Sequence, residues 1–468
     1  MRYTPFALAA LAAAVLAGCG GGGSSAGNQS TKIQFTSQVS FGDSLSDVGT
    51  YAVGTVAALG GGKYTVNSIP ASPQNWTELM AATLGLPAPC PAETGLDGEA
   101  AAGFSVTPTM HSGCYGYGQG GSRVTLPYGP GNANLPASEG GSPVLGQLTV
   151  PIVTQIQNHL TAVGGKFSGT EIVFVLGGAN DVFVQLATLQ VNATAQGQAA
   201  VTTLVTNQVT ADVTGGTCTP DPTTGGANCQ AQAEGELWQA SLGSTAAVTA
   251  AVTAQVQSDI KAGTCTPTDA QASNCQAQAE AELVTAYLTA QGTAAGEAWV
   301  ASTGGPAAVE AMGQAGGELA GYINNLILAN GAKYVTVVNI PDITTTPFGD
   351  ALDASSLSLL STMVSTFNTQ VQSGVAGNPN VLFVDANTQS HLNTQNPAQY
   401  GLTNVTTPAC NLATSANPLS SSLVCTTNNT IGGDVSHYLF ADTVHPTPYG
   451  YSLLAKYVAT QMALRGWL

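Results

Sequence analysis

The chain has 468 residues, of which 44% are apolar and only 7% are charged. This composition allows a large buried core and argues against intrinsic disorder. Nine Lys and Arg residues against 26 Asp and Glu residues give a formal net charge of −17, which argues against a basic surface for nucleic acid or anionic lipid.

The first nineteen residues have the features of a targeting segment. Arg2 precedes an apolar run over residues 6–17, which is too short to span a bilayer. The run ends Leu16-Ala17-Gly18-Cys19, which resembles a bacterial lipobox, where the cysteine is lipidated and becomes the new N-terminus. An ordinary signal peptide is the alternative, and in both cases the protein is expected to be exported.

The cysteines fit an exported protein. Removing Cys19 from the nine cysteines leaves an even number, as expected for disulfides in an oxidising compartment. A zinc site is less favoured, because no two cysteines are two to four residues apart and no His-x-x-x-His accompanies them. The order of the cysteines suggests four local pairs without proving them: Cys90 with Cys114, Cys218 with Cys229, Cys265 with Cys275, and Cys410 with Cys425.

Short apolar runs alternate with helical patterns along much of the chain. A weak strand over 38–41 leads into a Gly- and Pro-rich stretch, 50–146, which predicts long surface loops. Buried strands alternating with amphipathic helices then predict a parallel sheet covered on both faces. The later strands are expected at 171–176, 334–340 and 381–384, and the helices at 153–163, 319–328, 360–371 and 451–462.

A repeat interrupts this alternation between about residues 185 and 305. The segment 216–237 returns in similar form at 263–283. Two copies are too few for a solenoid, so they predict a duplicated helix–loop–helix unit with a small disulfide closing each loop. The segment would be an inserted helical subdomain, either a lid or substrate-docking arm, or a stabilising surface decoration without a catalytic part.

Residues 41–49, Phe-Gly-Asp-Ser-Leu-Ser-Asp-Val-Gly, place Ser44 where a strand passes into a turn. A serine nucleophile needs a base and an acid that orients the base. Asp442 lies three residues before His445, a spacing that allows the carboxylate to hold the imidazole in the tautomer that accepts the serine proton. Asp43 and Asp47 are expected to hold the turn instead.

Of the remaining histidines, His111, His159 and His391 lack an aspartate at that spacing, whereas His437 has Asp434 three residues before it. His159 falls on a helical pattern and is expected to be a surface or packing residue.

Two segments could supply donors to an oxyanion. In Gly118-Gln-Gly-Gly121-Ser-Arg123 the glycines would let a backbone N–H approach the reacting carbon. In Gly177-Gly-Ala-Asn180-Asp181 a side-chain amide follows a predicted strand. Taken singly, the first segment is better explained as a glycine turn and the second as an Asx cap that begins a helix.

Taken in order, these motifs resemble the GDSL, or SGNH, hydrolase family, through its branch of FGDSLSDxG-type bacterial esterases and lipases. The resemblance covers both ends of the chain and skips the repeat. It implies that Ser44 is the nucleophile, His445 the base and Asp442 its orienting acid. Ser44, Gly121 and Asn180 would form the oxyanion hole. The family commonly has an asparagine five residues before the glycine, but this position is Gly116 here. Because of this departure, Gly120 is the alternative to Gly121. Asp181 is expected to be structural.

The resemblance also implies an α/β fold of three α/β/α layers, flavodoxin-like, with a parallel sheet and an inserted α-helical subdomain. The expected division is a signal peptide with lipobox over 1–19, a Gly/Ser-rich tether over 20–34, catalytic segments over 35–186 and 306–468, and the helical repeat subdomain over 187–305.

The expected function is an exported serine esterase or lipase that forms an acyl-enzyme on an ester or lipid substrate, with no cofactor or metal. A lipid acyltransferase using the same acyl-enzyme, and a non-catalytic surface binding or display lipoprotein, are the alternatives. The protein is expected to associate with a membrane through the lipid anchor on Cys19. Because Gly20 stands where an aspartate often signals inner-membrane retention, an outer-membrane or cell-surface position is favoured, with secretion otherwise.

Overall fold

The computed structural model describes residues 33–68, 74–266 and 272–468. The predicted signal peptide with Cys19, and all of the predicted tether except its last two residues, lie outside the described residues. Within the described ranges, none of the helices is both long enough and apolar enough to cross a bilayer.

Four short parallel strands form the central sheet. In the order β1 (Gln38–Gly42), β4 (Ile172–Leu176), β5 (Val335–Val338) and β6 (Val381–Val384), each strand is hydrogen-bonded to the next. These runs are rich in valine, and β1, β4 and β5 are buried throughout, as expected for a parallel sheet covered on both faces. The prediction of an α/β fold with a parallel sheet is therefore confirmed.

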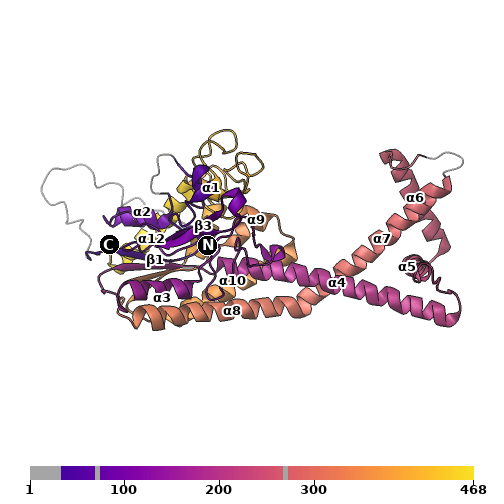
Figure 1. Cartoon of the computed structure of the whole chain (residues 1–468), viewed down its shortest axis with the longest axis horizontal. Helices are drawn as coiled ribbons and strands as arrows, with labels where there is room; N and C mark the ends of the chain where they lie inside the picture. The colour runs from indigo at the N-terminus through magenta and orange to yellow at the C-terminus, as the bar shows by residue number, and fades with distance from the viewer. Residues whose placement is uncertain (1–32, 69–73, 267–271) are drawn as a thin grey trace, which may run out of the picture.

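Helices cover both faces of the sheet (Figure 1). On one face Val173 and Val175 pack into a core with α3 (Ile152–Ala162), α8 (Gly305–Tyr322) and α10 (Ala354–Val375). Because side chains alternate along a strand, Phe174 and Leu176 point to the opposite face. There they pack with residues of α2 (Trp76–Thr83) and α12 (Pro448–Arg465).

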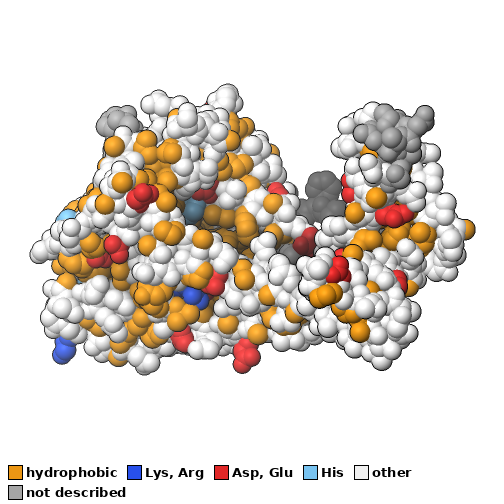
Figure 2. Space-filling model, turned by 45° about the vertical axis from the view of Figure 1, so that its right-hand side comes forward, with side chains coloured by type: hydrophobic (Ala, Val, Ile, Leu, Met, Phe, Trp, Pro, Cys, Tyr) orange, Lys and Arg blue, Asp and Glu red, His pale blue; other side chains and the backbone are white. Residues whose placement is uncertain are grey.

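An arm of helices extends from this body (Figure 1). The 37-residue helix α4 (Ala179–Gly215) leads outward, α5 (Ala227–Leu242) and α6 (Thr245–Ala262) lie at the far end, and α7 (Ala272–Trp299) returns along α4. In the space-filling view a notch separates the far end of the arm from the body, and charged side chains are sparse on this face (Figure 2). The predicted boundary between residues 186 and 187 falls inside α4, which runs without a break there. The predicted division into domains stays a prediction.

The two copies of the repeat make the same contacts at the far end of the arm. Gln208 donates a hydrogen bond to Asp212 in the first copy, and Gln255 donates one to Asp259 in the second. In each copy the aspartate carbonyl accepts the backbone N–H of the following cysteine. The two disulfides of the repeat are Cys218–Cys229 and Cys265–Cys275, and the body contains Cys90–Cys114 and Cys410–Cys425.

The stretch 50–146 contains more regular structure than its Gly- and Pro-rich composition predicts. The helix α2 begins with a capping box, in which the Asn75 side chain accepts the Glu78 N–H and the Glu78 carboxylate accepts the Asn75 N–H. The strands β2 (Glu93–Asp97) and β3 (Ser105–Met110) form an antiparallel hairpin. The remaining short helices are α1 (Gly54–Ala58), α9 (Pro347–Asp350) and α11 (Ala386–Gln395).

Phe174 is a sensitive test of the core. Its ring is fully buried and packs edge-to-face on Trp76, with ring centroids 5.1 Å apart. We expect Phe174→Ala to lower the free energy of unfolding by about 3–5 kcal/mol, because the cavity cannot collapse inside a packed sheet. Leu464→Ala, at a side chain 77% exposed on α12, should change it by less than about 0.5 kcal/mol. Equal shifts of the urea midpoints of the two variants would contradict this assignment of the core.

Candidate active site

Ser44 lies just beyond the carboxyl end of β1, in a short 3₁₀ turn, Ser44–Ser46. Asp43 begins the turn by accepting the Leu45 N–H. Gly42 ends the strand opposite Leu176 of β4, and a Cβ at this position would lie 2.0 Å from the Leu176 carbonyl oxygen. The glycine of the motif is therefore required by the close approach of two strands.

His445 lies within hydrogen-bonding distance of both Ser44 and Asp442. The Ser44 Oγ is 2.8 Å from His445 Nε2, and His445 Nδ1 is 2.8 Å from Asp442 Oδ2. With the proton on Nδ1 held by the carboxylate, Nε2 is left as the acceptor for the serine hydroxyl. The serine and the histidine are 401 residues apart in the chain, and the fold alone brings them together.

The surroundings of Asp442 keep its carboxylate charged. Burial raises its pKa, but the neighbouring His445 and a set of hydrogen bonds outweigh burial and hold the pKa well below its usual value. The carboxylate accepts the backbone N–H groups of Ser422, Val444 and His445 at 2.8–3.0 Å. The ring of Tyr64 packs against the imidazole, with centroids 4.8 Å apart.

Asn180 lies at the same site, in the first turn of the helix that follows the neighbouring strand β4. The pairing of Gly42 with Leu176 brings the ends of β1 and β4 together, and α4 begins three residues after Leu176, at Ala179. Asn180 and Ser44 line one cavity of about 340 Å³ together with His445. The Asn180 Nδ2 donates one hydrogen bond to the Ser122 carbonyl, and its second hydrogen is available for a ligand.

The structure distinguishes the two glycines that could complete an oxyanion hole. The Gly120 N–H donates to Asp47 Oδ2 at 2.9 Å and is therefore engaged. Within the described residues, the backbone N–H groups of Gly121 and Ser44 donate no hydrogen bond. Gly121 adopts φ +80°, a conformation that favours glycine. Gly121 is thus the better candidate, although it does not line the 340 Å³ cavity.

Asp181 fixes the segment that contains Gly121. Its carboxylate accepts Arg123 Nε at 3.0 Å and the Val124 N–H at 3.0 Å. Burial raises the pKa of Asp181, and the Arg123 guanidinium opposes this shift. Together with the bond from Asn180 to Ser122, these contacts tie three consecutive residues to the first turn of α4, which is a positioning role.

Asp43 and Asp47 hold the serine turn, as expected. Asp47 Oδ1 accepts the N–H groups of Gly49 and Thr50. Burial raises the pKa of Asp47 to about 6 and that of Asp43 to about 7. Asp43 Oδ2 has no hydrogen-bond partner in the described part of the chain, so the protonated form of this fully buried side chain is favoured.

Two other histidines make contacts with residues distant in the chain, which the residue spacing in the sequence does not reveal. His159 is buried among the rings of Phe41, Tyr117 and Phe167, and burial lowers its pKa to about 4, so it is a packing residue. His391 Nδ1 lies 2.7 Å from Asp342 Oδ2. This pair joins residues 49 apart in the chain, so a search at close spacing misses it.

Sequence reasoning missed most of the residues that shape the cavity. Phe183 on α4 and Phe348 on α9 line it beside Ser44, with their rings edge-to-face at 5.3 Å between centroids. Phe183 lies three residues after Asn180, a spacing that places both on one helix face, so the helical pattern contained a signal for it. Among the described residues, no group of three or more His, Cys, Asp or Glu side chains could hold a metal ion.

Residues 301–458 match the family model described as GDSL-like Lipase/Acylhydrolase. The chain therefore carries a GDSL-like lipase/acylhydrolase domain. The match covers less than half of the chain and includes Asp442 and His445, whereas Ser44, Gly121 and Asn180 precede it. No curated protein matches the chain. The family supports a hydrolase of the esterase or lipase kind and the SGNH fold that the sequence motifs resemble.

The raised pKa of Asp43 predicts how the free energy of unfolding depends on pH. Between its unfolded value of 3.8 and its folded value of about 7, the folded state holds a proton that the unfolded chain has released. The free energy of unfolding should therefore fall as the pH rises through this window. Asp43→Asn removes this contribution, which is on the order of 4 kcal/mol, so the variant should gain stability relative to the wild type between pH 5 and pH 8.

Urea unfolding at several pH values measures this difference. Glu310→Gln, at an exposed position on α8, serves as the control and should run parallel to the wild type. If the Asp43→Asn curve also runs parallel to the wild type, the buried carboxyl does not titrate as described.

Proposed function

We propose that the protein is a serine carboxylic ester hydrolase that acts through an acyl-enzyme on Ser44. The observation that carries this proposal is the 2.8 Å contact between Ser44 Oγ and His445 Nε2, with Asp442 hydrogen-bonded to the other ring nitrogen. A base beside the hydroxyl and an acid behind the base are what a serine nucleophile requires. The family match to lipases and acylhydrolases agrees with this chemistry.

In the first step the Ser44 oxygen attacks the ester carbonyl carbon while His445 takes the hydroxyl proton. The carbon–oxygen bond to the alcohol then breaks, and the alcohol leaves with that proton from His445. Water repeats the sequence on the acyl-enzyme: His445 takes a proton from water, the hydroxide forms the acid, and the proton returns to Ser44. Asp442 stays ionised throughout, as its lowered pKa allows.

The negative oxygen formed in each step needs donors that are already in place. The Ser44 and Gly121 N–H groups and the Asn180 side-chain amide supply three candidates. Asn180 and Gly121 are held in place by the contacts of the first turn of α4 with residues 122–124. A preformed hole of this kind costs little reorganisation during the reaction.

We also propose that the protein works outside the cytoplasm, anchored by lipid on Cys19 at the outer membrane or cell surface. The four disulfides of the described residues support export, because disulfides persist in oxidising compartments. Mass spectrometry of the N-terminal peptide tests the anchor, since it would show a lipidated cysteine or a free N-terminus.

The variant Ser44→Ala tests the catalytic proposal directly. We expect hydrolysis of p-nitrophenyl esters to fall by roughly 10⁴-fold or more, and labelling by a fluorophosphonate to disappear. Ser46→Ala is the matched control, because Ser46 lies in the same turn but accepts a hydrogen bond from the Trp76 indole instead of facing His445. It should still be labelled. Labelling that survives in Ser44→Ala would place the nucleophile elsewhere.

The variant Asn180→Ala tests the oxyanion hole. Loss of one donor should lower kcat by about 10²- to 10³-fold, while KM changes little because the contact strengthens only in the transition state. Steady-state kinetics on p-nitrophenyl butyrate measure both constants, and circular dichroism checks the fold. A variant that raises KM without lowering kcat would show that Asn180 binds the substrate and does not stabilise the transition state.

A further inference from the structure

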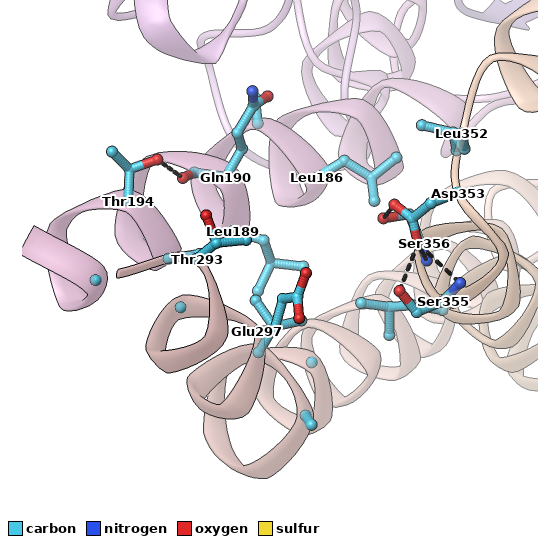
Figure 3. A pocket seen from close by; sticks show the side chains of 18 of the residues that line it. Leu186, Leu189, Gln190, Thr194, Thr293, Glu297, Leu352, Asp353, Ser355 and Ser356 are labelled. Atoms are coloured by element: carbon cyan, nitrogen blue, oxygen red, sulfur yellow. Dashed lines mark hydrogen bonds between the residues drawn. The ribbon is translucent and has the colours of Figure 1, made fainter. Parts of the chain in front are cut away.

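A second, larger cavity of about 1930 Å³ lies where the arm joins the body. Its walls come from α4 and α7 of the arm and from α8, α9 and α10 of the body. Figure 3 shows Leu186 and Leu189 of α4 at this cavity, with Thr293 of α7 nearby and Leu352 on the opposite side. The cavity therefore exists only because the chain makes its helical excursion between β4 and β5.

This cavity adjoins the catalytic one. Pro130, Phe183 and Phe348 line both. The rings of Phe183 and Phe348 stand edge-to-face, 5.3 Å apart between centroids, and lie at the boundary between the two cavities. A chain that extends from Ser44 past these apolar rings would enter the larger cavity, which is the groove at the base of the arm.

Small residues form the floor of the groove. A Cβ at Gly197 of α4 would lie 2.4 Å from the Gly292 carbonyl oxygen of α7, and one at Gly296 would lie 2.6 Å from the Ala193 carbonyl oxygen. These four residues all line the cavity. Their small size brings the two helices close together and leaves the floor without projecting side chains.

The walls of the groove are mainly apolar or carry the methyl group of threonine. The charged residues among its described lining are three carboxylates, of Glu139, Glu297 and Asp353, with no Lys or Arg. Such a lining fits an uncharged hydrocarbon chain and disfavours an anionic group. The apolar residues along the walls include Leu186, Val201, Leu288, Val300, Val309 and Leu359.

We infer that this groove binds the long acyl chain of the ester substrate, so that the arm is a substrate-binding element of a long-chain esterase. The inference rests on the proposed function and adds the substrate class. The cavity of about 340 Å³ at Ser44 is at the lower end for a small-molecule site, about 300–1,000 Å³. It accommodates the ester and a short acyl group, and the methylenes of a longer chain continue into the groove.

The position of Phe183 at this boundary favours the acyl chain over the alcohol. Phe183 lies one helical turn beyond Asn180, which is the side where the carbonyl oxygen is held. The alcohol leaves from the side of His445, whose Nε2 returns the proton. On that side Phe440, which also lines the cavity, pairs with Pro446.

Filling the groove should lower activity on long chains alone. Thr293 on α7 and Ser358 on α10 are exposed, line the groove and make no side-chain hydrogen bond within the described residues. We expect Thr293→Trp and Ser358→Trp to leave kcat/KM for p-nitrophenyl acetate and butyrate unchanged. For the laurate and palmitate esters kcat/KM should fall by about fourfold for each methylene displaced from the groove. Ala294→Trp adds the same bulk to an exposed position of α7 outside the lining and is the matched control.

The outcomes separate the failure of this inference from the failure of the proposed function. If the wild type hydrolyses no ester, the proposed function falls. If it does, but both tryptophan variants keep the wild-type chain-length profile, the groove does not hold the acyl chain. If the variants lose activity on hexadecyl acetate but not on p-nitrophenyl palmitate, the groove binds the alcohol and the assignment is overturned.

A binding measurement gives a readout without catalysis. Ser44→Ala should bind palmitate in calorimetry with a negative heat-capacity change, as expected for burial of apolar surface. Adding Thr293→Trp to Ser44→Ala should weaken this binding by at least about tenfold, which corresponds to two or more displaced methylenes. Equal palmitate affinity in the single and double variants would overturn the inference.

Discussion

The parallel pairing of β1 with β4 is the constraint on which the site depends. It sets Gly42 opposite Leu176, so the turn with Ser44 and the helix with Asn180 leave the sheet at the same edge. The carboxyl ends of parallel strands are the usual place for ligands in such sheets. A slip of one residue in this register would turn the side chains of β4 to the opposite face and move the asparagine away from the serine.

The rest of the site is attached to this edge by contacts of the backbone. The segment with Gly121 is tied to the first turn of α4 through Asn180 and Asp181. Asp442 is held by three N–H groups, one of them from Ser422, and the neighbouring chain is closed by the Cys410–Cys425 disulfide. Asn180, Asp181 and Asp442 are thus held in place by hydrogen bonds. Asp43 and Asp47, on either side of Ser44 in the chain, are fully buried acids.

Local signals in the sequence predicted the strands and the family motifs, whereas contacts between distant segments left no such signal. The apolar runs gave β4 and β6 nearly to the residue, and the motif around Ser44 with the Asp442–His445 spacing led to the family that the match at residues 301–458 confirms. The capping box of α2 was present in the sequence and was overlooked among the surrounding glycines and prolines. Tertiary packing forms the His391–Asp342 pair, the cavity at Ser44 and the groove at the base of the arm. No residue spacing along the chain encodes them.

The continuity of α4 limits how the arm could change in length. This one helix, about 55 Å long at 1.5 Å per residue, carries the asparagine of the site at one end and the first repeat loop at the other. Each residue inserted into it would rotate everything beyond by about 100°. The glycine contacts with α7 would then lose their alignment. Lengthening by seven residues in both helices nearly preserves the phase, so the arm is free to grow in paired heptads but not in single steps.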